Sequence, residues 1–274
     1  MLLRPSFLAR RVGERERERE REMCTLEKRG SLFILTLTGD DQHRLNPALI
    51  DSIKAALDRV RSDSSSNNST SPCSALITTA HGKFFTNGYD LAWAKSGGPA
   101  SATKDRLLLM SFKFRSLITD LISLPMPTIA AVTGHASAAG FLLALCHDYI
   151  LMRKDRGFLY MSELDIALPI PAWFTAVLRS KIGSPMALRD VLLRSAKLTA
   201  QAAVERGIIE SAHDGAEETV GAAVKLGEEL VGRRWDGHVY GQIRMVVFDD
   251  LLRAAGFDES VEDPNHVNKV ISRL

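Results

Sequence analysis

Residues 128–140 read TIAAVTGHASAAG, and this stretch decides the fold. Its first five residues are apolar or β-branched and predict a short buried strand over Thr128–Val132. Glycine at Gly134 then marks a turn, and the small residues after it predict a helix over 137–146. Because the first N–H groups of a helix have no partner within the helix, we expect this turn to hold an anion or a polarised carbonyl group.

A second glycine-bearing turn follows another predicted strand. Residues 75–79 are apolar or β-branched and predict a buried strand, and residues 81–91 then read HGKFFTNGYDL. Turns that directly follow buried strands are where α/β folds place their binding sites. The two turns are therefore the first candidates for a functional site.

Outward from these turns, strands and helices alternate. Residues 31–38 predict the first strand, apolar spacing after Pro47 predicts a helix through Val60, and 103–123 predicts a long amphipathic helix. Residues 148–152 predict a further strand. Strands separated by helices indicate an α/β fold with right-handed βαβ units. A Ser- and Asn-rich segment predicts a flexible loop over 62–74.

Beyond Pro171 the pattern is nearly all helical. The predicted helices span 172–182, 185–193, 200–206, 217–234 and 239–255. The strands are therefore expected early in the chain and the helices late.

Composition excludes several classes of protein. The 274 residues are 45% hydrophobic and 25% charged with a formal charge of +2, values typical of a globular protein. Such a balance is far from that of a nucleic-acid-binding domain, and no apolar stretch is long enough to span a membrane. The cysteines, Cys24, Cys73 and Cys146, lie far apart without metal-ligand spacing, so we expect free thiols and no zinc site.

The two turns resemble the paired signatures of the crotonase (enoyl-CoA hydratase/isomerase) superfamily. The similar segments are GYDL (88–91), TIAAVTGHA (128–136) and Ala139-Gly140. The resemblance implies a ββα superhelix with a spiral core and a C-terminal helical region, and an acyl-CoA thioester as substrate. It also implies that backbone N–H groups of Tyr89 and Ala139 bind the thioester oxygen. The loop residues expected to support substrate binding are Gly82, Phe84, Asn87, Gly88 and Gly140.

Acid and base residues then distinguish the reactions of this superfamily. Hydratases of this superfamily use two glutamates. The resemblance implies that Leu142 occupies the position of the first glutamate in this chain. Glu163 occupies the position where isomerases keep a single base. The expected activity is thus a Δ3,Δ2-enoyl-CoA isomerase that needs no metal or other cofactor, with a hydratase or other lyase, or an inactive acyl-CoA-binding subunit, as alternatives.

Some assignments stay open from the residues alone. Asp90 is expected to cap or brace its turn. Lys83, Arg153, Lys154 and Arg156 are candidates for the CoA phosphates, and the sequence does not choose among them. A serine hydrolase built on Ser137, His135, His147 and Asp148 is disfavoured, because the turn is not a G-x-S-x-G elbow.

The ends of the chain predict its organisation and location. Within residues 1–22, Glu14 to Glu22 alternates Glu and Arg without an apolar face, and the whole segment is expected to be a disordered or spurious extension, with Met23 as the start. A spiral core is expected over 23–212 and a helical region over 213–274.

Residues 24–30 and 152–157 resemble plant peroxisomal members of the superfamily that act as isomerases. Ser272-Arg273-Leu274 resembles the peroxisomal Ser-Lys-Leu address and predicts binding to an import receptor. The resemblance further implies a homotrimer or hexamer.

Overall fold

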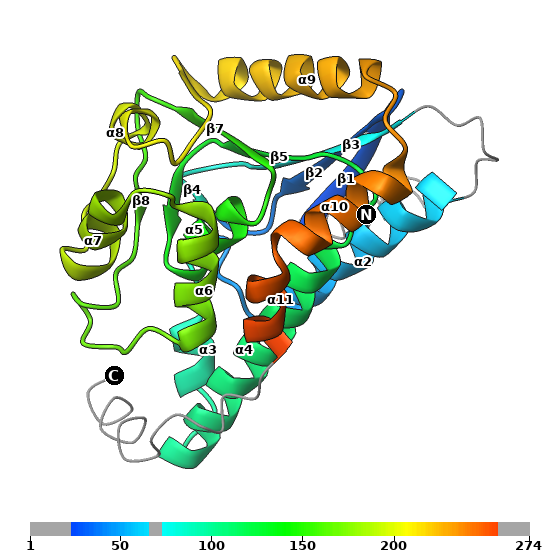
Figure 1. Cartoon of the computed structure of the whole chain (residues 1–274). Helices are drawn as coiled ribbons and strands as arrows, with labels where there is room; N and C mark the ends of the chain where they lie inside the picture. The colour runs from blue at the N-terminus through cyan, green and yellow to red at the C-terminus, as the bar shows by residue number, and fades with distance from the viewer. Residues whose placement is uncertain (1–22, 66–72, 257–274) are drawn as a thin grey trace, which may run out of the picture.

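The structure, a computed structural model, describes residues 23–65 and 73–256. The predicted extension 1–22 and the tripeptide at 272–274 lie outside these residues. The described chain forms two β-sheets surrounded by helices (Figure 1). The helices are α2 (Pro47–Ser65), α3 (Leu91–Lys95), α4 (Ala100–Ile122), α5 (Ala139–Leu145), α6 (Ala172–Lys181), α7 (Pro185–Leu193), α8 (Ala200–Glu205), α9 (Ala216–Gly232), α10 (Gly237–Val247) and α11 (Asp249–Gly256).

The larger sheet has the strand order β1-β2-β3-β5-β7-β9. Its strands are β1 (Cys24–Arg29), β2 (Leu32–Leu37), β3 (Ala75–Ala80), β5 (Thr128–Val132), β7 (Tyr149–Arg153) and β9 (Ser211–His213). Every neighbouring pair is parallel except β1 and β2, which form an antiparallel hairpin. The predicted α/β fold with parallel strands is confirmed.

Apolar side chains cover both faces of this sheet. Along β3, Leu76 packs into the main core, whereas Ile77 packs against α9 on the opposite face. The two residues separate because side chains alternate across a strand. A Cβ at Gly227 would lie 3.0 Å from Leu32, so α9 approaches the sheet closely. Figure 1 shows α9 along one side of the sheet, with α2, α4 and α5 on the other.

A smaller sheet lies beside the first and is built from short strands. Its parallel order is β4-β6-β8, with β4 at Phe84–Thr86, β6 at His135–Ser137 and β8 at Leu159–Tyr160. The sequence did not predict these strands, because two or three residues cannot display a period-2 pattern. Since β6 takes the first residue of the helix predicted over 137–146, that helix begins instead at Ala139.

The prediction that residues 31–38 form the first strand was wrong, because β1 precedes β2. The strand β1 lies at the sheet edge and exposes polar residues such as Thr25 and Glu27. Its sequence therefore lacks the continuous apolar run that predicts a buried strand. Gly30, with φ of +58°, and Ser31 form the two-residue loop of the hairpin. This positive φ is readily adopted by glycine.

Two helical predictions also differ from the structure. The predicted loop over 62–74 begins late, because α2 continues to Ser65. Ser62 and Ser64 donate hydroxyl hydrogen bonds of 2.9 and 2.7 Å to the carbonyls of Asp58 and Val60, which accommodates serine inside the helix. The predicted helix 239–255 is divided at Phe248 into α10 and α11.

The break at Phe248 coincides with a new helix start. Asp249 and Asp250 occupy the first turn of α11, where carboxylates interact favourably with the helix dipole. The described chain beyond Pro171 is nearly all helical, as predicted, and Ser211–His213 adds a parallel edge strand next to β7.

Candidate active site

The ends of the three short strands bring the two predicted turns together. Because β4, β6 and β8 are parallel, the segments that follow them leave the same edge of the small sheet. Gly88 comes after β4, Ala138 after β6 and Glu163 after β8. The Ala138 N–H donates a hydrogen bond of 2.9 Å to the Tyr160 carbonyl, which ties the second turn to β8.

Gly88 is in direct contact with the second turn. Its φ is +70°, and a Cβ there would lie 3.0 Å from the Ser137 carbonyl oxygen and 3.5 Å from the Ala139 nitrogen. A side chain at this position would therefore be both strained and crowded. The structure thus places the peptide before Tyr89 next to the peptide before Ala139, the two groups predicted to donate to one oxygen.

The start of α5 leaves its N–H groups available to a ligand. Ala139 is the first residue of the helix, and the preceding Ala138 gives no side-chain cap. Ala138 has a φ of +49°, a conformation costly for a residue other than glycine and found where function requires it. A Cβ at Gly140 would lie 2.3 Å from the Thr86 carbonyl, so α5 packs directly on β4.

The first turn is held by neighbouring segments. The Leu45 N–H donates to the Gly88 carbonyl at 2.8 Å, and the Asp90 N–H donates to the Leu45 carbonyl at 3.3 Å. The Asp90 carboxylate accepts a hydrogen bond from the Trp93 N–H at 2.9 Å and caps α3, as predicted. The Tyr89 ring packs 5.8 Å from that of Phe114. These contacts fix the direction of the turn.

Glu163 is a buried carboxylic acid in a turn that is otherwise partly or fully exposed. The residue is only 6% exposed, and its Oε2 has no hydrogen-bond partner among the described residues. The turn is closed by the Leu168 N–H, which donates to the Glu163 carbonyl at 2.9 Å. Burial raises the pKa of the Glu163 carboxyl from 4.5 to about 7, although the backbone N–H groups of Glu163 and Ser162 oppose the rise.

No second acid lies near this carboxyl in the part of the chain that the structure describes. Leu142, one turn after Ala139, is fully buried. Asp190 is the other buried carboxylic acid of these residues. It forms ion pairs with Arg189, Arg194 and Arg206. Glu163 has no ion pair within the described residues and is therefore the acid or base available at this edge.

The other loop residues predicted to support substrate binding are Asn87, Gly82 and Phe84. Asn87 donates hydrogen bonds from its backbone and its side chain to Gln42, at 2.9 and 2.7 Å. Gly82 lies against the Asp41 carboxylate, where a Cβ would be 2.3 Å away. Gly82 and Phe84 lie at the beginning of β4, so the structure places them away from Tyr89 and Ala139. Sequence reasoning missed Leu45, which acts through its backbone groups, and Gln42, which accepts through both its backbone carbonyl and its side chain.

A serine-hydrolase site is not assembled. The ring nitrogens of His147 lie 2.9 Å from the Leu143 carbonyl and 2.8 Å from the Thr78 hydroxyl, so both are engaged away from Ser137. Over residues 23–65 and 73–256, no group of three His, Cys, Asp or Glu side chains could hold a metal ion. No helix within the same ranges is long and apolar enough to cross a membrane.

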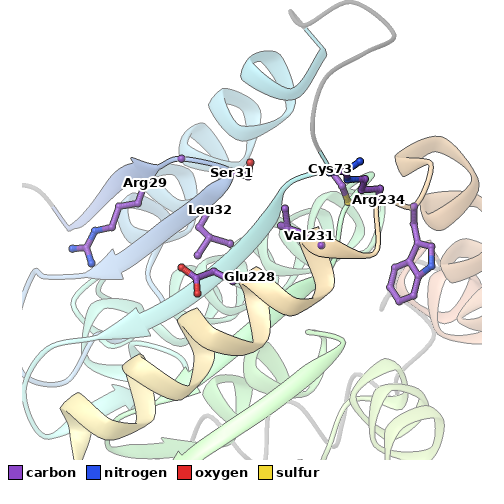
Figure 2. A pocket seen from close by; sticks show the side chains of 10 residues that line it. Arg29, Ser31, Leu32, Cys73, Glu228, Val231 and Arg234 are labelled. Atoms are coloured by element: carbon purple, nitrogen blue, oxygen red, sulfur yellow. The ribbon is translucent and has the colours of Figure 1, made fainter.

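One cavity lies beside the first turn, and another lies away from both turns. One, of about 270 Å³, adjoins the first turn through Asp90 and is also lined by His43, Arg44 and Asn46. Another, of about 690 Å³, opens between the β1–β2 hairpin and the end of α9, where Glu228 and Val231 lie near Leu32 (Figure 2). The larger cavity is lined by no residue of either predicted turn.

The chain is similar to proteins of known family. Residues 27–237 match a family described as enoyl-CoA hydratase/isomerase. The chain is 60% identical over 230 residues to enoyl-CoA delta isomerase 1, peroxisomal, of Arabidopsis thaliana, a match that covers 84% of this chain and 91% of that protein. It is 49% identical over 240 residues to enoyl-CoA delta isomerase 2, peroxisomal, of the same plant. This match covers 87% of this chain and 98% of that protein.

Solved structures share the fold. A probable enoyl-CoA hydratase of Mycobacterium tuberculosis superposes with a TM-score of 0.75 at 21% identity, covering 86% of this chain and 93% of that one. An enoyl-CoA hydratase/isomerase family protein of Pseudomonas syringae also superposes with a TM-score of 0.75 at 20% identity. This match covers 88% of this chain and 99% of that one.

Proposed function

Because this chain belongs to the enoyl-CoA hydratase/isomerase family, we propose that it is a Δ3,Δ2-enoyl-CoA isomerase. Its substrate would be a 3-enoyl-CoA, cis or trans, and its product the trans-2-enoyl-CoA used in fatty-acid β-oxidation. The observation that carries this proposal is a single buried, unpaired carboxyl, Glu163, beside two backbone donor turns, with Leu142 at the other candidate acid position. High identity to proteins named enoyl-CoA delta isomerase supports it.

The proposed reaction moves one proton within the substrate. The Glu163 carboxylate removes a proton from C2, and the electrons of that C–H bond form the C1=C2 bond of a dienolate. The N–H groups of Tyr89 and Ala139 bind the thioester oxygen as it becomes negative, and each such donor contributes about 3 kcal/mol. Glu163 then returns the proton to C4, which leaves the double bond between C2 and C3. No net oxidation or reduction occurs, so the step requires no redox cofactor.

Product analysis tests the proposal. The purified chain is expected to convert cis-3-hexenoyl-CoA and trans-3-hexenoyl-CoA to the conjugated 2-enoyl-CoA. Formation of 3-hydroxyacyl-CoA from a 2-enoyl-CoA at a comparable rate would instead identify a hydratase, which needs a second acid or base. Tight binding of these thioesters without any product would identify an inactive binding subunit.

The pKa of Glu163 sets the pH dependence of the proposed reaction. The residue acts as a base only when it is ionised, and its pKa is raised to about 7. We therefore expect kcat/KM to fall about tenfold for each pH unit below 7 and to level off above it. A pH–rate profile of kcat/KM measures this, and a rate that stays constant from pH 5 to 8 would contradict the assignment of Glu163 as base.

An exposed apolar stripe on α10 supports the proposal that the chain assembles as a homotrimer or hexamer. Val239, Ile243, Val246 and Val247 are 49%, 60%, 77% and 64% exposed, and their spacing places them on neighbouring turns of one helix face. Contiguous exposed apolar surface of this kind marks an interaction site.

Replacing Val246 with Glu is expected to reduce the assembly to smaller species, because association would bury the new charge. Sedimentation equilibrium measures the mass. Leu193→Glu, at an equally exposed leucine of α7, is the matched control and should leave the mass unchanged. A wild-type chain that sediments as a monomer would contradict the proposal.

Location in the peroxisome is also a proposal. Two similar proteins are named peroxisomal, and Ser272-Arg273-Leu274 fits the address read by the import receptor. A fluorescent protein fused so that Leu274 remains the free C-terminus should enter peroxisomes, and removal of 272–274 should leave it in the cytosol. Cytosolic signal from the intact fusion would refute the address.

A further inference from the structure

Ala138 connects β6 to α5 in a backbone conformation that residues other than glycine rarely adopt. Its φ is +49° and its ψ is −122°, a combination outside the main regions allowed for residues with a side chain. These angles are those of the first central residue of a type II′ turn, a position dominated by glycine. Glycine would form this turn without strain, so the chain reversal alone does not account for the methyl group of Ala138.

The segments on both sides of Ala138 hold it in this conformation. Its N–H donates to the Tyr160 carbonyl at 2.9 Å, and its carbonyl accepts the N–H of Leu142 in the first turn of α5 at 3.1 Å. A Cβ at Gly140 would lie 2.3 Å from the Thr86 carbonyl oxygen, so α5 has no room to move toward β4. A strained residue persists only where its surroundings fix it in this way.

The Ala138 methyl group faces the first turn. A Cβ built on Gly88 would lie 3.2 Å from that methyl carbon and 3.5 Å from the Ala139 nitrogen. Ala138 is half-buried, whereas its neighbours Ser137 and Ala139 are buried. The methyl group therefore lies between the two turns, against the one residue of the first turn whose Cα must remain bare for the turns to approach.

The separation of the two turns decides how well their N–H groups bind one oxygen. An oxyanion is stabilised when each donor lies about 2.7–3.1 Å from it, and a displacement of about 1 Å lowers the rate about a hundredfold. Leu45 holds the Gly88 carbonyl at 2.8 Å, and Tyr160 holds the Ala138 N–H, so these bonds tie each turn to a different neighbour. The contact between Ala138 and Gly88 joins the turns to each other.

We propose that the Ala138 methyl group is a spacer that sets the separation of the N–H donors of Tyr89 and Ala139. This role rests on the proposed function, because it concerns the donors of that site. Ala138 is a positioning residue, which acts through the two N–H groups and takes no part in proton transfer. Removing the methyl group should relieve the strained backbone and also free the two turns to change their separation. The fold should then become more stable while the reaction becomes slower, whereas loss of an ordinary packing group destabilises a fold.

Replacing Ala138 with Gly tests the spacer. The melting temperature is expected to rise by about 2–4 °C, because relief of the strain exceeds the added freedom of the unfolded chain. The kcat on 3-hexenoyl-CoA should fall at least about tenfold with little change in KM, since the donors bind the transition state more tightly than the substrate. Ala138→Ser keeps a Cβ in the same place and should retain most of the wild-type rate. A wild-type kcat in Ala138→Gly, or a lower kcat together with a lower melting temperature, would overturn the spacer.

The matched control is Arg234→Gly. Arg234 also has a positive φ, of +52°, and it is an exposed residue of the connection between α9 and α10, outside both turns. Glycine at this position relieves strain of the same kind and should also raise the melting temperature, but kcat should keep its wild-type value. An equal fall of kcat in this control would show that the rate follows the general rigidity of the chain, and it would overturn the spacer.

Infrared spectroscopy separates the spacer from the proposed function, because it requires no turnover. Two N–H groups that bind a thioester oxygen polarise the carbonyl and lower its stretching frequency. The wild-type protein should lower the frequency of bound hexanoyl-CoA that carries an isotopic label at C1, and Ala138→Gly should lower it less. A wild-type protein that shows this shift but does not isomerise 3-hexenoyl-CoA would refute the proposed function and leave the spacer standing. Equal shifts in the two proteins would overturn the spacer, even in an active isomerase.

Discussion

Replacing Glu163 with Gln should lower kcat about 10²- to 10⁴-fold while leaving the binding of acyl-CoA nearly unchanged. Glutamine fills the same space but cannot accept the C2 proton. Steady-state rates on 3-hexenoyl-CoA and calorimetric binding of a saturated acyl-CoA measure the two effects. Asp165→Asn, which neutralises an exposed carboxyl two residues away, is the matched control and should keep the wild-type rate.

The same substitution should stabilise the protein at alkaline pH. The pKa of Glu163 is 4.5 when unfolded and about 7 when folded, so the folded state retains the proton between these values and stability falls as pH rises through them. Above pH 7 the ionised buried carboxyl costs up to about 3 kcal/mol. The Glu163→Gln variant should therefore gain most in unfolding free energy at pH 8 and little at pH 5.

Urea unfolding at both pH values measures this gain. A loss of activity with no pH-dependent change in stability would mean that the carboxyl is not held in a desolvated site. Retention of the wild-type rate would remove Glu163 from the mechanism.

Replacing Arg244 with Met should destabilise the protein by about 3–5 kcal/mol, because it leaves a buried charge and several buried carbonyls without their donor. The guanidinium is 4% exposed and pairs with Asp148 at 2.7 Å. It also donates to the carbonyls of Ile122, the last residue of α4, and of Leu124 and Met126 beyond it. Such a loss is a large part of the 5–15 kcal/mol typical of a domain.

Chemical denaturation of matched variants checks this expectation. Arg253→Met breaks an ion pair with Asp249 on α11 that is largely exposed on both sides, and it should cost less than about 1 kcal/mol. Adding Asp148→Asn to Arg244→Met should recover part of the loss, since it removes the uncompensated charge. Equal effects of the two arginine variants would show that α10 is not anchored through Arg244.

The sequence by itself determined the elements with strong local signals. The apolar run at Thr128–Val132 and the helix Pro185–Leu193 have the predicted bounds, because a strand in a parallel sheet is apolar throughout and Ser184-Pro185 is a strong helix start. The spacing of GYDL and Ala139-Gly140 likewise indicated the family. These features depend on neighbours in the chain and are visible without the fold.

Only the tertiary structure decided what depends on distant residues. The strands β4, β6 and β8 are too short for a pattern, and pairing with one another defines them. The contact of Gly88 with Ala139 joins segments about fifty residues apart. The raised pKa of Glu163 arises from burial by other elements, and the ion pair of Lys154 depends on where Asp214 lies. Desolvation and ion pairing are properties of surroundings in space, which the order of residues along the chain does not specify.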